Sequence, residues 1–130
     1  MQFVESRLIG LKNDETGREL VLSFIESGGR KFAVDLHGVE RLLIQELRQQ
    51  NVVEELVHWT QKSDAVGLRE AAFALVAGVA EAECDPRLAV VAQNIVDRVM
   101  RGELEMLEIR AVFGAQGIAS FARMAVRSEE

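Results

Sequence analysis

Two histidines and one cysteine are the residues of this chain whose types could support metal or nucleophilic chemistry. His37 and His58 lie about twenty residues apart and lack the HxH or HExxH spacing of metal-binding histidines. A catalytic Cys84 would need a neighbouring base to form its thiolate, but Glu83 and Asp85 flank it and disfavour a second negative charge. We therefore expect no metal site, no cysteine nucleophile and no intramolecular disulfide.

Two sets of carboxylates could be considered for acid and base catalysis: Glu54 with Glu55, and Glu103 with Glu105 and Glu108. Both sets fall in segments that we predict to be strands, where adjacent side chains point to opposite faces. Glu103 and Glu105 would share a face, but acidic residues on an exposed strand commonly prevent edge-to-edge pairing. We expect no catalytic residues, and the chain is not expected to be an enzyme.

Two glycine-containing segments, Ser27–Arg30 and Gly114–Gly117, resemble phosphate-binding loops only in composition. Neither leads from a predicted strand into a helix N-terminus, which is the arrangement that phosphate binding requires. Hairpin turns explain both segments, so no cofactor is expected.

The charge balance of the chain limits the classes of partner that we expect it to bind. The chain has 130 residues, with 21 acidic and 15 basic side chains and a net charge of -6. Nucleic acid is not expected, because phosphate binding depends on clustered Lys and Arg. The uncharged, apolar run Ala71–Ala80 is about half of the roughly 20 residues that cross a bilayer. With no signal peptide evident and a single cysteine, we expect a cytoplasmic protein that does not bind membranes.

The first third of the chain has the pattern of a three-stranded antiparallel meander. A strand over 3–11 is followed by a turn over 13–17, and apolar residues then alternate with others over 19–24 and again over 31–37. The glycines of Ser27–Arg30 separate these last two strands.

After Gly38 the apolar spacing changes to three and four, which predicts an amphipathic helix that ends near Asn51. The valine-rich segment 52–59 predicts a fourth strand.

Two further helices have clear end signals. Ser63 or Asp64 can cap a helix that Gly78 weakens or ends, and Asp85 followed by proline can start another that ends at Gly102. A strand from Glu103, the turn at 114–117 and a returning strand over 118–126 complete the chain, and residues 127–130 form a polar tail that we expect to fray. These elements predict one α+β domain over residues 1–130, with an antiparallel or mixed sheet of about six strands on about three helices.

The candidate binding surface is acidic. Trp59 could anchor a partner, and carboxylates in and around the middle connections could attract a basic one. The candidate partner-binding residues are Glu54, Glu55, Trp59, Asp64, Glu81, Glu83 and Asp85.

The segments 38–43, 49–53 and 102–109, together with Phe113-Gly114-Ala115, resemble those of small bacterial α+β immunity proteins encoded beside polymorphic or contact-dependent toxins. The resemblance implies a cytosolic inhibitor that binds one cognate toxin, often a basic nuclease, without a cofactor. Three alternatives remain open: a type III secretion chaperone, a small-ligand domain, and a structural subunit of a homo-oligomer. The sequence is compatible with a monomer or a homodimer.

Overall fold

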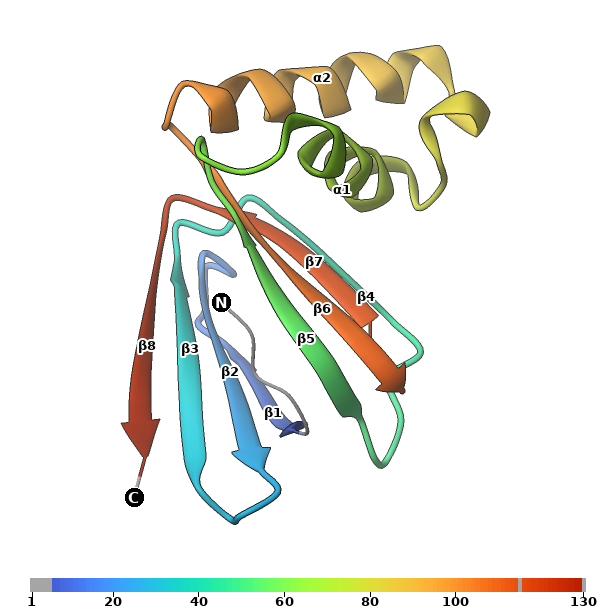
Figure 1. Ribbon diagram of the computed structural model, residues 1–130. Coiled ribbons are helices and arrows are strands. Elements are labelled where there is room, and N and C mark those ends of the chain that lie inside the picture. The colour runs from blue at the N-terminus through green and yellow to red at the C-terminus, as the bar shows by residue number, and fades with distance from the viewer. Residues whose placement is uncertain (1–5, 115, 130) are drawn as a thin grey trace.

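The computed structural model describes residues 6–114 and 116–129, and most of its regular secondary structure is β-strand (Figure 1). The elements in chain order are β1 (Ser6–Asn13), β2 (Glu19–Glu26), β3 (Lys31–His37), β4 (Arg41–Gln45), β5 (Val52–Trp59), α1 (Ala65–Ala77), the short 3-10 helix η1 (Glu81–Glu83), α2 (Pro86–Met100), β6 (Glu105–Phe113), β7 (Gln116–Phe121) and β8 (Arg123–Glu129).

All eight strands belong to one antiparallel sheet in the order β4-β7-β6-β5-β1-β2-β3-β8. The sheet folds over so that the β1-β2-β3-β8 half faces the β5-β6-β7-β4 half. The halves are joined where β1 pairs with β5, at Ser6 and Arg7, and where the chain passes from β3 to β4 and from β7 to β8. Strands that switch between halves at such corners are typical of orthogonal sheet packing.

Gly38 lies at the corner where the chain passes from β3 to β4. His37 pairs with Arg123 and Arg41 pairs with Ser120, so three residues on one strand lie opposite two on the other. This is a β-bulge, which bends a strand and increases its twist. Gly38 has φ +70°, and a side chain there would meet Ala122. Glycine therefore permits the bend that carries both strands from one half to the other.

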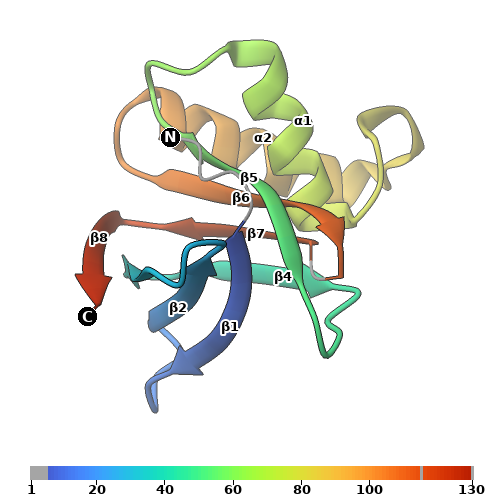
Figure 2. The same cartoon turned by 60° about the horizontal axis from the view of Figure 1, so that its bottom comes forward.

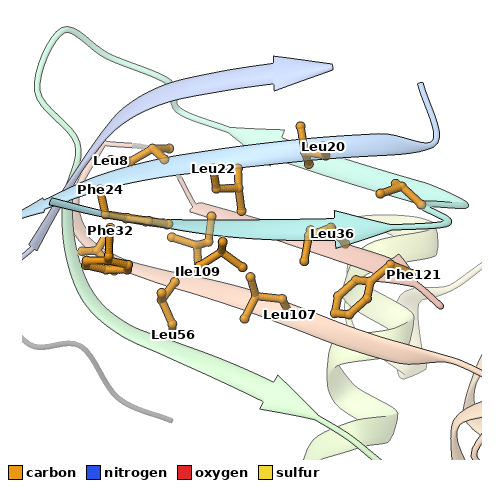
Figure 3. Close-up of a cluster of buried hydrophobic side chains, with 14 residues drawn as sticks. Leu8, Leu20, Leu22, Phe24, Phe32, Leu36, Leu56, Leu107, Ile109 and Phe121 are labelled. Atoms are coloured by element: carbon orange, nitrogen blue, oxygen red, sulfur yellow. The ribbon is translucent and has the colours of Figure 1, made fainter. Parts of the chain in front are cut away.

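The space between the two halves holds the main hydrophobic core (Figure 3). Phe24 and Phe32 stack with their ring centroids 4.9 Å apart, and side chains from β5, β6 and β7 approach them from the opposite half. The buried members of this core are Leu8, Leu20, Leu22, Phe24, Phe32, Val34, Leu36, Val39, Val53, Leu56, Leu107, Ile109, Ala119 and Phe121.

A second core lies between α1, α2 and the outer face of the β5-β6-β7-β4 half, which the two helices cover (Figure 2). Leu68 and Val99 from the helices pack there with Trp59, Met106 and Ile118 from the strands. The molecule thus has three layers: a sheet half, a second sheet half, and a pair of helices.

The predicted ends of both long helices are confirmed. The side chain of Asp64 accepts a hydrogen bond from the backbone N–H of Gly67 at 2.8 Å, and Gly78 ends α1 with φ +70°. Asp85 caps α2 in the same way and Pro86 is its first residue. These are the capping geometries that satisfy the free backbone groups at helix ends.

The predicted α+β fold class, with about six strands and about three helices, is wrong: the part of the chain that the structure describes is mostly β, with eight strands and two α-helices. The predicted helix after Gly38 is instead β4, which pairs with β7. Ile44 packs partly buried against the main core and Leu43 partly buried against the second one, so the leucine-rich run presents apolar side chains on both faces of the sheet.

The end of the chain also differs from the prediction. The strand predicted over 118–126 is divided into β7 and β8 at Ala122, and the tail expected to fray belongs to β8 as far as Glu129. Glu130 and the first residues of the strand predicted over 3–11 lie outside the described residues. The meander, the strand over 52–59 and the hairpin of β6 and β7 are confirmed.

In the part of the chain that the structure describes, neither α-helix has the length and apolar composition needed to cross a bilayer.

Candidate functional site

Each histidine is paired with a carboxylate on a neighbouring strand. His37 Nδ1 lies 2.8 Å from Glu19 Oε2, and His58 Nε2 lies 2.6 Å from Glu105 Oε1. These are cross-strand pairs of the kind that stabilise sheets. Within residues 6–114 and 116–129, no group of three or more His, Cys, Asp or Glu side chains could hold a metal ion.

Two of the candidate binding residues, Glu55 and Trp59, belong to one chain of polar contacts along β5 and β6. Arg110 lies 3.1 Å from Glu55 and 3.4 Å from Glu108, and Trp59 Nε1 donates a hydrogen bond to Glu108 at 3.1 Å. The hydrogen bond to Glu108 raises the pKa of Arg110. The Trp59 ring is only 8% exposed and packs beside Gly67 at the start of α1. In this arrangement the ring holds α1 on the sheet.

Three other candidate residues, Glu81, Glu83 and Asp85, come together in the connection between α1 and α2. Glu81 makes two hydrogen bonds of 2.7 Å with Arg69, which lower the pKa of its carboxyl. Asp85 caps α2, and hydrogen bonds from Arg87 lower its pKa. Glu83 is exposed.

The remaining two candidates are separate from that connection. Asp64 caps α1 beside Trp59, and Glu54 is exposed at an irregularity in the pairing of β5 with β6. The structure therefore divides the predicted acidic surface: Glu81, Glu83 and Asp85 lie in the connection between α1 and α2, and the other candidates lie on β5 and at the start of α1. Most of these carboxylates already bond to arginine or cap a helix.

A different surface, which sequence reasoning missed, lies at the open end of β1. Here a groove of about 330 Å³ runs between β1 and the segment that connects β4 to β5. Ile9 and Leu11 on β1 are 49% and 41% exposed, and Leu47 on the opposite wall is 61% exposed. The residues that line the groove are Arg7, Leu8, Ile9, Gly10, Leu11, Leu47, Arg48, Gln49, Gln50 and Asn51.

One wall of this groove is an unpaired strand edge. Beyond the two residues that pair with β5, the Leu8 N–H donates to the Asn51 carbonyl at 2.9 Å. From there β5 and β1 diverge, and among the described residues no strand pairs with the edge of β1 over residues 9–13. An unpaired edge presents backbone donors and acceptors that can bind another extended chain.

The opposite wall is held in shape by its own hydrogen bonds. The Asn51 side chain accepts from the Arg48 N–H at 2.9 Å and donates to the Arg48 carbonyl at 2.8 Å, which closes the segment into a loop. The Arg48 guanidinium lies 5.5 Å from the ring centroid of Phe113, which is 54% exposed. Both walls are therefore positioned in this structure.

No protein-family model, curated protein or solved structure matches this chain.

Proposed function

We propose that this protein is a non-catalytic protein-binding domain. The observation that carries the proposal is the groove beside β1, where an unpaired strand edge and exposed apolar side chains lie together. Contiguous exposed apolar surface of this kind is characteristic of interaction sites. Both histidines, and Glu55 and Glu108 among the carboxylates considered for catalysis, are instead bonded to side chains on neighbouring strands.

A cognate toxin is the partner that we propose to test first, because of the resemblance to immunity proteins. If the toxin is basic, the acidic residues offer a second contact surface. Glu54 and Glu83 are both exposed, and neither side chain makes a hydrogen bond or ion pair with the described residues. Free carboxylates of this kind accelerate association with a basic partner through long-range attraction.

The test is co-expression of the tagged protein with its neighbouring open reading frames, followed by mass spectrometry and light scattering of the purified complex. We expect a stoichiometric complex and suppression of the partner's toxicity. A clean homo-oligomer with no partner would refute the proposal and favour a structural role. Copurification of a secreted effector without toxicity would favour the chaperone alternative.

Two variants then locate the contact on the complex. Reversing Glu54 and Glu55 to lysine should slow association and weaken its dependence on salt if the acidic surface is used. Leu47→Asp should instead raise the dissociation rate if the groove is used, because it places a charge on an apolar contact. Leu47 is 61% exposed, so this change leaves the core intact.

A further inference from the structure

We propose that the groove beside β1 binds an extended acidic segment of another protein, which adds to the sheet as a strand and places carboxylates near Arg7 and Arg48. This inference rests on the proposed protein-binding function and names the chemistry of the partner at that surface.

The backbone geometry favours an extended peptide. The unpaired edge covers residues 9–13 of β1, about the usual length of a strand. A segment added there would bond to the backbone along one side, while the loop over 47–51 would border it on the other. Main-chain hydrogen bonds supply affinity in this mode of recognition, and pockets for alternate side chains supply specificity.

The charge of the groove favours an acidic segment. The whole chain carries a net charge of -6, but the charged side chains that line the groove in the described part of the chain, Arg7 and Arg48, are both basic. The Arg7 side chain is exposed and makes no hydrogen bond or ion pair with the described residues. The Arg48 guanidinium pairs with the exposed Glu46 at 2.9 Å and lies over the Phe113 ring. Both guanidinium groups can therefore bind an incoming carboxylate, and Lys12 adds positive charge on the same strand.

The exposed apolar side chains of the groove require apolar side chains on the partner segment as well. Ile9, Leu11 and Leu47 together expose apolar surface on both walls of the groove. Side chains of an extended peptide alternate between its two faces. The matching segment thus has apolar residues at every second position and acidic residues between them.

A larger groove beside α1 lacks the features that suggest a binding site beside β1. Its volume is about 600 Å³, but its lining includes Arg69 and Glu81, which pair with each other. It has no unpaired strand edge, because a helix forms one of its walls. The groove beside β1 is smaller but combines a free backbone edge with the Arg7 guanidinium, which has no ion-pair partner among the described residues.

A direct test uses the synthetic peptide acetyl-(Glu-Val)₄-amide and ¹⁵N chemical-shift mapping of the full chain. We expect shifts confined to residues 9–13 and 47–50, with an affinity that falls as salt is raised. The charge-reversed peptide acetyl-(Lys-Val)₄-amide should bind at least about tenfold more weakly, since it lacks the charge-assisted hydrogen bonds. The same acidic peptide with alternate backbone nitrogens methylated should also lose binding, since it cannot complete the strand pairing.

The matched protein variants are Arg7→Gln with Arg48→Gln, and Arg30→Gln as the control, because Arg30 is an exposed arginine in the turn between β2 and β3. The double variant should weaken acidic peptide binding by about tenfold or more, while the control should leave it unchanged. Equal loss in both variants, or binding that ignores peptide charge, would overturn the inference. Shifts over residues 9–13 that depend on protein concentration alone would identify a second copy as the occupant and would also overturn it.

Failure of this inference can be distinguished from failure of the proposed function. A cognate partner that still binds the double variant with unchanged affinity would refute the groove as its site and leave the protein-binding function standing. Peptide binding at the groove without any cognate partner would support only the inference.

Discussion

Replacing Gly38 with alanine should destabilise the protein by about 2–5 kcal/mol, and this is the sharpest test of how the sheet changes direction. Gly38 has φ +70°, which costs an L-residue roughly 1–2 kcal/mol. An added Cβ would lie 2.9 Å from the Ala122 Cβ, on the strand that bends alongside it. Overpacking of this kind costs about 1–3 kcal/mol, and the two costs add because they have separate origins.

Gly17 provides the matched control. Its φ of +74° is almost the same, but no atom lies within 4 Å of a Cβ added there. Gly17→Ala should therefore lose only the roughly 1–2 kcal/mol of backbone strain. The two variants can be compared by urea denaturation, followed by far-UV circular dichroism and by the fluorescence of Trp59, the only tryptophan.

A second substitution separates the clash from other effects. In the Gly38→Ala background, Ala122→Gly removes the opposing methyl group, so the double variant should recover part of the lost stability beyond the sum of the single effects. If Gly38→Ala loses no more stability than Gly17→Ala, or if Ala122→Gly gives no recovery, the close approach of the two strands does not explain the corner.

Three further changes test other parts of the structure. Arg98 donates hydrogen bonds to Glu40 and lowers the pKa of its carboxyl. This pair therefore stabilises the fold above the ordinary glutamate pKa, and the stabilisation is lost as the pH falls through the lowered pKa. Glu40→Gln should lower the free energy of unfolding by about 0.2–1 kcal/mol at pH 7, and urea titrations at acidic pH should show no difference from wild type. The Ser120 hydroxyl is buried and has no hydrogen-bond partner among the described residues, so Ser120→Ala should leave the melting temperature unchanged or raise it. A Cβ at Gly67 would lie 2.6 Å from the Trp59 ring, so Gly67→Ala should lower the urea midpoint and shift the tryptophan emission, although alanine favours a helix by about 1 kcal/mol.

The parts of the fold that local chemistry determines were predictable from the sequence. Alternating apolar residues gave the positions of β2 and β3 because each strand has one face in the main core. The ends of the helices followed from Asp64, Gly78 and Asp85, whose capping bonds involve only residues nearby in the chain. Neither the alternation of apolar residues nor the capping residues can be changed by segments far away in the chain.

The segment after Gly38 was predicted wrongly because its conformation depends on a distant strand. Leucines at spacings of three and four fit a helix, but β4 pairs with β7, more than seventy residues later in the chain. Leu43 and Ile44 then face different cores. A run with apolar residues on both faces has no period of two, so its pattern does not identify a strand.

The sequence showed which acidic residues and which tryptophan the candidate surface contains, but not how the fold arranges them. Asp64 and Asp85 are acidic residues that the fold uses as helix caps, and Trp59 is covered by α1. The sequence marks Asp64 and Asp85 both as possible helix caps and as candidate binding residues, and it does not show that Trp59 is covered, because the burial of Trp59 depends on how α1 packs. The groove was not predicted because its edge becomes visible only when the partners of β1 are known.

Two strand edges of the sheet differ in how their side chains protect them against pairing with another chain. Proteins commonly protect edge strands with charged side chains. β8, which pairs only with β3, carries Arg123, Arg127 and Glu129. The unpaired stretch of β1 over residues 9–13 carries one charged side chain, Lys12, and exposes Ile9 and Leu11. Charged side chains protect β8 along its length, whereas the unpaired stretch of β1 has Lys12 and a register irregularity at Ile9 beside its exposed apolar side chains, so of these two edges that of β1 is better suited to receive another chain.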